Sequence, residues 1–314
     1  MKSIYINSQG GLGFNLALAS VLHEFHDLYD KVYVLSPYYD VFQCCSAVNG
    51  VYKPAEIRDF IFDAKYSDAR LICERMYDSE DFIYKKVSYA DAWRKAAGLP
   101  VKGNKEGSDT KSELHIEDVF PSLLTTAEDI KKNVHNNGFK NFVLMQFTGG
   151  QSPLVKVPVK DGKQDWSKVK YNYENEPLKR HYPITLAQKF VDLYRKEHKN
   201  TAIIMYQLPN EPTPKGEGIF TFTVPYLAYY LLAKDIMCKG AVVIDSSLQH
   251  LIAGVCPTTV IWGHSLPASF GYEYNSNIIQ DCRRDDILYF SALGPSGARI
   301  DYIQPEELLE KLKK

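Results

Sequence analysis

Short apolar runs alternate with helix-spaced apolar positions along most of the chain. Residues 242–244 and 258–261 are continuous runs rich in β-branched side chains, which is typical of strands covered on both faces of a sheet. The residues between them read as a polar turn followed by a helix, and Pro257 marks the return to a strand. This order predicts a parallel βαβ unit.

The same order opens the chain. Strands are predicted at residues 3–7 and 31–35. Between them lies a set of apolar residues spaced for one helical face: Phe14, Leu18, Val21, Leu22 and Phe25. Repeated alternation of strands and helices predicts a doubly wound α/β fold.

The remaining pattern predicts further elements and a division into two domains. Further strands are expected at residues 57–62, 141–147 and 201–206, and helices at residues 89–97, 126–136, 185–197, 224–235 and 305–313. Residues 102–111 are polar and are expected to form a surface loop. Because the strand at 141–147 opens a second α/β unit, we predict domains over residues 1–137 and 138–314.

Composition narrows the class of protein. A chain of 314 residues is long enough for two domains of ordinary size. The 37 basic and 38 acidic residues give a net charge of −1, so no overall field draws the chain to nucleic acid or anionic lipid. The six cysteines show neither a CxxC pair nor a disulfide framework. We therefore expect reduced thiols and a cytoplasmic location, with no signal peptide and no transmembrane segment.

The turn at residues 245–247 carries the first candidate chemistry. Asp245, Ser246 and Ser247 are residue types that cap helices, and the start of a helix offers unpaired backbone N–H groups to an anion. His250 follows about one helical turn later and is placed to reach the same anion. The arrangement favours a site for a phosphate or for the diphosphate of a nucleotide.

The order of motifs in the second half resembles the donor-binding half of the ADP-heptose transferases, a family with the GT-B glycosyltransferase fold. The matching stretches are the small-residue turn at 147–152, the Arg-His-Tyr-Pro run at 180–183, the loop at 207–211, the turn at 245–250 and the Trp-Gly-His-Ser run at 262–265. The resemblance implies two Rossmann-like, doubly wound domains that face a cleft. It places the acceptor in the N-terminal domain and a nucleotide sugar in the C-terminal domain.

The resemblance also assigns roles to single residues. Arg180 would pair with the donor diphosphate, because a guanidinium can hold two phosphate oxygens at once. Glu211 would accept hydrogen bonds from ribose hydroxyls, and Ser247 stands where a glycine is usual in the family. The implied donor-binding residues are Thr148, Gly149, Gly150, Gln151, Arg180, Gln207, Glu211, Asp245, Ser246, Ser247, His250 and Gly263.

The glycine-rich loop after the first strand resembles the first-strand turn of GT-B enzymes. Gly10, Gly11, Gly13 and Asn15 are therefore expected to line the cleft. In the heptosyltransferases an aspartate of this loop is thought to deprotonate the acceptor hydroxyl, and Gly11 occupies that place here. The catalytic base must then come from elsewhere.

Candidates for the base are sought at the carboxyl ends of strands, where open α/β sheets bind their ligands. Asp40 follows the second predicted strand and is our first candidate. Asp78, Glu80 and Asp81 form an alternative acidic cluster in the same domain. Because the chain has no Asp-x-Asp metal anchor, we expect neither a metal ion nor a cofactor. A helix N-terminus, Arg180 and Lys179 would neutralise the leaving diphosphate instead.

These features predict an inverting, metal-independent glycosyltransferase that moves a sugar from an ADP- or UDP-sugar to a hydroxyl of a glycan or lipopolysaccharide-like acceptor. One alternative is a phage-encoded enzyme that glycosylates hydroxymethylated bases in DNA, with the lysine-rich residues 156–180 along the phosphate backbone. Alternatives of another class are a non-catalytic nucleotide-sugar-binding module and an epimerase of the same architecture.

Overall fold

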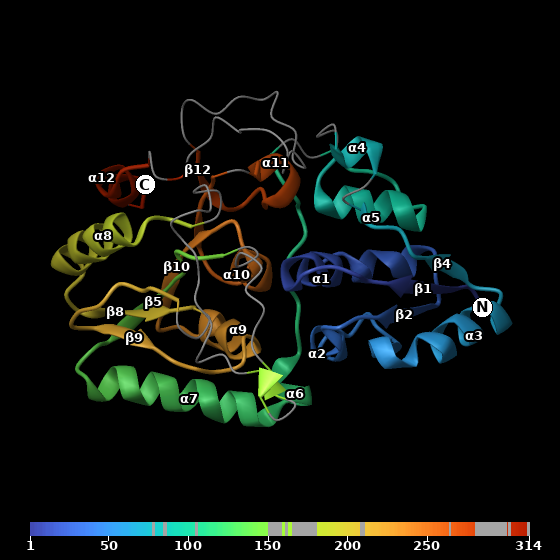
Figure 1. Cartoon of the computed structure of the whole chain (residues 1–314), viewed down its shortest axis with the longest axis horizontal. Coiled ribbons are helices and arrows are strands. Elements are labelled where there is room, and N and C mark those ends of the chain that lie inside the picture. Colours follow the sequence, from blue (N-terminus) through green and yellow to red (C-terminus); the bar gives the residue numbers. More distant parts are fainter. Residues whose placement is uncertain are drawn as a thin grey trace.

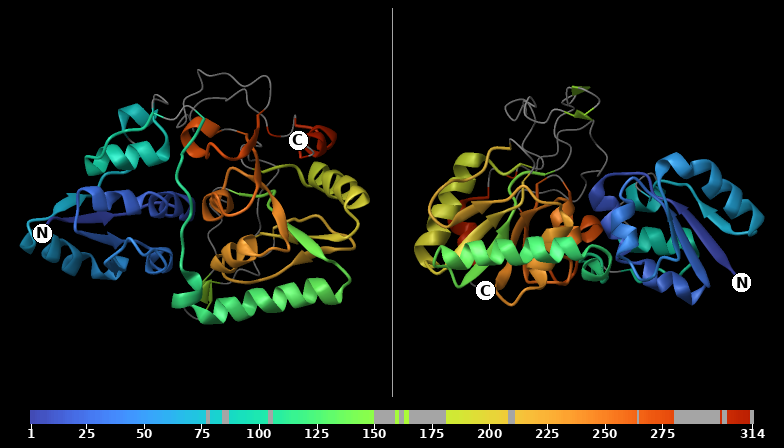
Figure 2. Two further views of the ribbon diagram at one scale, coloured as in Figure 1. Left: turned by 180° about the vertical axis from the view of Figure 1, so that it is seen from behind. Right: turned by 90° about the horizontal axis from the view of Figure 1, so that it is seen from below.

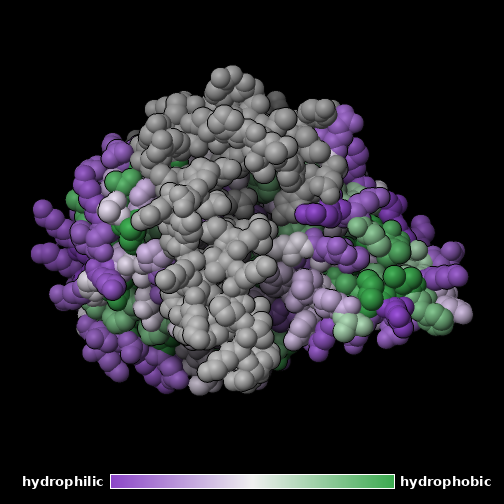
Figure 3. Space-filling view, viewed as in Figure 1, coloured by the Kyte–Doolittle hydropathy of each residue, from purple (hydrophilic) through white to green (hydrophobic). Residues whose placement is uncertain are grey.

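The computed structural model describes residues 1–76, 79–83, 87–103, 106–149, 159–160, 163–164, 181–207, 211–263, 265–279, 300 and 303–312. Two α/β units lie side by side, each built around one parallel sheet with helices on both faces (Figure 1). The N-terminus lies at the outer end of the first unit, away from the second (Figure 2). On the face drawn in Figure 3, apolar residues gather on the first unit and the outer rim of the second unit is polar.

The first unit has a four-stranded sheet in the order β3-β2-β1-β4. Its parallel strands are β1 (Ser3–Asn7), β2 (Lys31–Leu35), β3 (Gly50–Tyr52) and β4 (Arg70–Ile72). One face is covered by α1 (Leu12–Ala19), the 3-10 helix η1 (Leu22–Asp27) and α5 (Tyr89–Ala97), and the other by α3 (Ile57–Tyr66). Short helices complete the unit: α2 (Tyr39–Gln43), η2 (Pro54–Glu56) and α4 (Glu80–Ile83).

The second unit has a six-stranded sheet in the order β12-β11-β10-β5-β8-β9. Its parallel strands are β5 (Asn141–Met145), β8 (Thr201–Met205), β9 (Ile219–Thr221), β10 (Cys238–Ile244), β11 (Thr258–Ile261) and β12 (Ser276–Ile278). The helices are α6 (Ile116–Val119), α7 (Pro121–Asn136), α8 (Ile184–Glu197), α9 (Leu227–Lys234), α10 (Ser247–Leu251), α11 (Pro267–Phe270) and α12 (Pro305–Lys311). A separate two-stranded hairpin is formed by β6 (Val159–Lys160) and β7 (Lys163–Gln164).

Successive residues of the central strands pack on opposite faces of this sheet. Val143 and Val242 join a core with α8 and α12, whereas Leu144 and Val243 join the core that includes α7 and α9. A strand buried on both faces needs an apolar side chain at every position. This requirement explains the continuous apolar runs of β5, β8 and β10.

The two units also share one core across their junction. Helix α1 packs directly on α10, and the apolar cluster of α1 and α5 continues into Leu248 and Leu251. The connecting segment, which lies between α5 and α6, is hydrogen-bonded to both units. The N–H of Ser108 donates to the carbonyl of Gly271 in the second unit at 2.8 Å, and the N–H of His115 donates to the carbonyl of Cys44 in the first unit at 2.8 Å. The units are therefore held together by packing as well as by the chain.

Most predicted elements are confirmed, including both βαβ units and the doubly wound class. The strand predicted at 57–62 is wrong, because these residues open helix α3 and only Phe60 of the run Phe60-Ile61-Phe62 is buried. The surface loop predicted at 102–111 is wrong in its second half, since Ser108 and Thr110 are buried between the units. None of the described helices is long and apolar enough to cross a membrane.

The division at residues 137 and 138 stays a prediction. Helix α7, which precedes it, packs against α9 of the second unit. The apolar stripe from Phe14 to Phe25 is buried as expected, but two helices, α1 and η1, carry it in place of one.

Candidate functional site

The carboxyl ends of the two sheets face each other across the junction. Helix α1 follows β1 and helix α10 follows β10, and these two helices are in contact. The strands of the first unit run from the outer end toward the second unit (Figure 1). Since ligands of open α/β sheets bind outside the carboxyl ends of strands, the candidate site lies at this junction.

In the second unit, the loops after β5, β8 and β10 meet at this edge. The hydroxyl of Thr148 donates a hydrogen bond of 2.7 Å to Oε2 of Glu211. A Cβ atom at Gly149 would lie 2.6 Å from the Cβ of Ser246, so only a glycine allows the loops after β5 and β10 to approach this closely. The structure therefore brings together four predicted donor-binding residues from three loops.

The turn after β10 is built differently from the prediction. Ser246 is the N-cap of α10, but its side chain makes no capping bond and donates instead to Oε1 of Gln146. Oδ1 of Asp245 accepts a hydrogen bond of 2.7 Å from Gln249. The expectation that these side chains cap the helix is wrong for Ser246. The Ser246 side chain instead joins the end of β10 to the end of β5. The first N–H groups of α10 therefore receive no capping oxygen from Ser246.

Three other predicted residues of the second unit lie beside this turn. Ser247 is half-buried and lies beside Tyr206, which directly follows β8. Gln207 is half-buried, and within the described part of the chain its Oε1 atom has no hydrogen-bond partner. Gly263 is buried directly after β11 and Trp262.

His250 lies inside the contact between the two units. It is buried, with Nδ1 2.9 Å from the hydroxyl of Tyr272. A Cβ atom at Gly13 would lie 2.9 Å from Cδ2 of the imidazole, and the ring of Tyr89 packs edge-on against it. Two residues predicted for opposite sides of a cleft, Gly13 and His250, are thus direct neighbours.

In the first unit, Asn15 organises the glycine-rich loop from within. Its side chain is fully buried, and Oδ1 accepts hydrogen bonds of 2.7 Å from both Ser8 and Ser36. Nδ2 donates to the carbonyl of Gly11 at 3.0 Å. Asn15 therefore joins the carboxyl ends of β1 and β2. Gly10 has a φ of +149°, a conformation that favours glycine, and the space beside Gly11 is open within 4 Å of an added Cβ.

Asp40 lies at the junction as predicted from its place after β2. It occupies the first turn of α2, is half-buried, and accepts a hydrogen bond of 3.1 Å from the N–H of Val41. Across the junction it faces the hydroxyl of Tyr226, just before α9. Burial raises the pKa of Tyr226, and the adjacent Asp40 carboxylate raises it further, so the phenol keeps its proton.

Several predicted residues are not placed at this site. Gly150, Gln151, Asp78, Lys179, Arg180, His264 and most of the lysine-rich segment lie outside the described residues. Asp81 pairs with Lys95 of α5, and Glu80 is exposed on α4. The described residues contain no group of three or more His, Cys, Asp or Glu side chains that could hold a metal ion.

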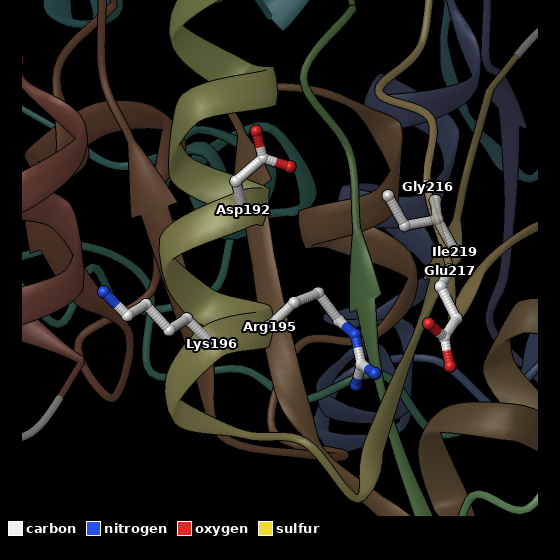
Figure 4. A pocket seen from close by; sticks show the side chains of 6 residues that line it. All are labelled: Asp192, Arg195, Lys196, Gly216, Glu217 and Ile219. Atoms are coloured by element: carbon white, nitrogen blue, oxygen red, sulfur yellow. The ribbon is translucent and has the colours of Figure 1, made fainter.

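A surface pocket of about 320 Å³ lies elsewhere, between α8 and β9 (Figure 4). Asp192, Arg195, Lys196 and Glu217 give it charges of both signs. The Arg195 guanidinium stacks on Phe139 and donates to the carbonyl of His198 at 3.0 Å. Because these groups lie on the outer side of the second unit, the pocket is separate from the junction.

Sequence reasoning missed the tyrosines of the junction. Tyr206 follows β8 directly, so the rule that places ligands at strand ends would have found it. Tyr226 and Tyr272 carry no such signal, because their positions depend on how the two units pack.

Comparisons with known proteins bear on the fold. No family model matches the sequence, and no curated protein matches it. Among solved structures, a glycosyl transferase family 9 protein from Veillonella parvula superimposes with a TM-score of 0.65 at 9% identity, over 99% of this chain and 96% of that one. The ADP-heptose lipopolysaccharide heptosyltransferase II of E. coli gives 0.55 at 14% identity, over 100% and 98% of the two chains. The E. coli heptosyltransferase WaaC with ADP gives 0.55 at 12% identity, over 99% of each.

The chain has the fold of these GT-B glycosyltransferases. The fold expected from the motif order is thereby confirmed, and both described units correspond to parts of the same architecture.

Proposed function

We propose that the chain is a GT-B glycosyltransferase that uses a nucleoside diphosphate sugar as donor. One observation carries the proposal: the loops after β5, β8 and β10 meet at the carboxyl edge of the second sheet, opposite the carboxyl edge of the first. The residues that meet there are Thr148, Gly149, Glu211 and Ser246. Structural neighbours that span the chain support it, because they are glycosyltransferases and one was solved with ADP.

The donor diphosphate is assigned to the turns after β5 and β10. Gly149 keeps side-chain atoms away from these turns, so that backbone N–H groups can reach phosphate oxygens. We assign Arg180 as the cation for the leaving group and Glu211 as the acceptor for ribose hydroxyls; the hydrogen bond from Thr148 to the Glu211 carboxylate supports the second assignment. We propose that no metal ion takes part. The dipoles of backbone N–H groups and the guanidinium of Arg180 stabilise the charge of the leaving diphosphate instead.

The acceptor hydroxyl is assigned to the first unit, with Asp40 as the base. In a single in-line displacement the hydroxyl oxygen bonds to the anomeric carbon, the bond from that carbon to the diphosphate breaks, and the hydroxyl proton passes to Asp40. Attack from the face opposite the leaving group inverts the anomeric centre. We infer a glycan hydroxyl as the acceptor.

Thermal shift with ADP and with UDP, in EDTA, tests donor binding. One nucleotide is expected to raise the melting temperature of the wild type, because a ligand that binds only the folded protein stabilises it. Arg180→Ala and Glu211→Gln are expected to reduce the shift, whereas Asp192→Asn in the remote pocket on α8 is the matched control. Equal shifts in all variants would contradict the site.

Release of nucleoside diphosphate from the donor then tests catalysis. Turnover with a lipopolysaccharide-core oligosaccharide supports glycosyl transfer to a glycan. Turnover only with hydroxymethylated DNA would replace the glycan acceptor. Retained donor affinity with no turnover on any acceptor would contradict an enzymatic role and favour a binding module.

A further inference from the structure

Asn15 is the centre of a buried hydrogen-bond network that joins two loops of the first unit at the junction. The side chains of Asn15, Ser8 and Ser36 are all fully buried. Oδ1 of Asn15 accepts hydrogen bonds of 2.7 Å from both serine hydroxyls. Its Nδ2 donates to the carbonyls of Gly10 at 3.4 Å and Gly11 at 3.0 Å. Because Asn15 is fully buried, it acts on a ligand in the cleft only through the loops that it holds.

The backbone carbonyls fix the direction of these bonds. A carbonyl oxygen can only accept, so the amide nitrogen of Asn15 must face Gly11, and its amide oxygen must face the two serines. Since the Ser36 hydroxyl gives its proton to Asn15, its oxygen is left to accept, and it accepts from the backbone N–H of Tyr38 at 2.9 Å. One directed chain of bonds therefore runs from the N–H of Tyr38 to the carbonyl of Gly11, and such bonds polarise one another.

This chain begins at the turn that opens helix α2. Tyr38 is the N-cap of α2, and its side chain makes no capping bond. The carbonyl of Tyr38 accepts a hydrogen bond of 3.1 Å from the N–H of Val41, and Asp40 lies between these two residues in the first turn. A helix of five residues has few hydrogen bonds of its own. The position of Asp40 therefore depends on where Ser36 holds Tyr38.

We propose that Asn15 and Ser36 are positioning residues that hold Asp40 in register with the glycine-rich loop. The inference rests on the proposed function, which assigns Asp40 as the base and places the acceptor in the first unit. A general base must lie within hydrogen-bond reach of the proton that it takes. A misplacement of about 1 Å can cost about a hundredfold in rate. The chain from Tyr38 to Gly11 keeps the base at a constant distance from an acceptor held at the loop.

Ser8 provides the matched control for Ser36. Both hydroxyls are fully buried, and both donate to the same oxygen of Asn15 at 2.7 Å. Ser36 differs because its oxygen also holds the N–H of Tyr38. If the network only stabilised the fold, Ser36→Ala and Ser8→Ala would have equal effects on the turn and on catalysis. A positioning role predicts that Ser36→Ala alone disturbs them.

Hydrogen exchange of the Tyr38 amide tests the chain of bonds without any ligand. In protein labelled with ¹⁵N-tyrosine, the signal of Tyr38 is identified by its loss in Tyr38→Phe. Exchange at this amide is expected to speed up at least about tenfold in Ser36→Ala, because the lost bond lets the turn open, and to keep its wild-type rate in Ser8→Ala. Val41 and Phe42 of α2 are buried in the core, so the helix should stay folded in both variants.

Steady-state kinetics then test the role of the chain in the reaction. In Ser36→Ala we expect kcat to fall by about 10–100-fold, because the base is misplaced. The donor KM and the thermal shift with the nucleotide should stay near the wild-type values, since the donor is assigned to the second unit. Ser8→Ala should keep the wild-type kcat. Asn15→Asp puts an oxygen against the Gly11 carbonyl and should also lower kcat; if this variant does not fold, Ser36→Ala alone decides the test.

The two proposals fail in different ways. If the wild type turns over no acceptor, or if Asp40→Asn keeps the wild-type kcat, the proposed function or its base is contradicted, whatever hydrogen exchange shows. Unchanged exchange at Tyr38 in Ser36→Ala, a wild-type kcat in that variant, or equal losses of kcat in the two serine variants would overturn only the inference about Asn15 and Ser36.

Discussion

The hydroxyl of Thr148 donates a hydrogen bond of 2.7 Å to the carboxylate of Glu211, and this bond joins the loop after β5 to the loop after β8. Both side chains are buried, so the carboxylate depends on protein donors rather than on water. The bond thus fixes a negative group at the carboxyl edge of the second sheet, where the nucleoside is assigned.

Thr148→Val removes this donor and keeps the shape of the side chain. A buried carboxylate that loses one hydrogen bond should lower the free energy of unfolding by about 1–3 kcal/mol. Thr148→Ser retains the hydroxyl and should remain within about 1 kcal/mol of the wild type, since it loses only a methyl group. Chemical denaturation of the three proteins measures the difference. Equal losses in both variants would show that the methyl group, not the hydrogen bond, is responsible.

Gly149→Ala tests the close approach of the loops after β5 and β10. The new Cβ would lie 2.6 Å from the Cβ of Ser246, which cannot move without its backbone. Overpacking of this kind should cost about 1–3 kcal/mol of stability. Because the turns must separate, we also expect ADP affinity to fall at least about tenfold, which corresponds to 1.4 kcal/mol.

Gly11→Ala is the matched control for Gly149→Ala. It adds the same methyl group at a position with open space within 4 Å and an ordinary φ of −74°. Its stability and ADP affinity should stay near the wild-type values. A similar loss of affinity in both variants would contradict the assignment of the diphosphate to the turn of Gly149.

Arg94→Met tests the buried charge cluster that fastens α5 within the first unit. The fully buried guanidinium of Arg94 donates to both carboxylate oxygens of Glu24 at 2.7 Å, to Asp91 at 2.8 Å and to Asp109 at 2.7 Å. Removing one partner of a buried ion cluster leaves uncompensated carboxylates, so we expect a loss of about 3–5 kcal/mol of stability. Arg58→Met on the exposed side of α3 is the control and should change stability little.

The same cluster predicts how stability depends on pH. Burial acts to raise the pKa of Glu24, but the hydrogen bonds and charge of Arg94 outweigh it and hold the pKa below the ordinary value of 4.5. A carboxyl with a lowered pKa stabilises the folded state fully above its unfolded pKa, and this contribution is lost as the pH falls through the folded pKa. The wild type should therefore lose stability below about pH 4.5, and Arg94→Met should lose less over that range. Equal slopes in urea denaturation from pH 6 to pH 3 would exclude this origin.

Local patterns predicted most elements, and the errors have a common physical origin. The run at Phe60, Ile61 and Phe62 looks like a strand because three apolar residues are adjacent, yet only Phe60 enters the core and the other two lie exposed on helix α3. The local pattern also could not predict that Ser108 and Thr110 of the connecting segment are buried. A polar stretch is buried only where both units supply partners for its hydroxyls.

For the candidate site, too, the sequence could predict contacts within one sheet but not contacts between the two units. Thr148, Glu211 and Ser246 follow strands of one sheet, so the strand order brings them together, and reasoning from the sequence could predict it. The contact of Gly13 with His250 joins the two units and depends on their relative orientation. No periodicity in either segment encodes that orientation, and hence the partners of His250 could not be predicted.

Asp40→Asn tests the proposed base directly. The substitution keeps the size of the side chain and its place opposite Tyr226, but an amide cannot take the acceptor proton. We expect kcat to fall by about 10²–10⁴-fold, the usual contribution of a general base, while the thermal shift with the nucleotide stays unchanged. Asp59→Asn, an exposed carboxylate on α3, is the matched control. Tyr226→Phe should affect kcat less than Asp40→Asn, because it removes only the phenol that faces the carboxylate. A kcat of Asp40→Asn within a few fold of the wild type would assign the base to another residue.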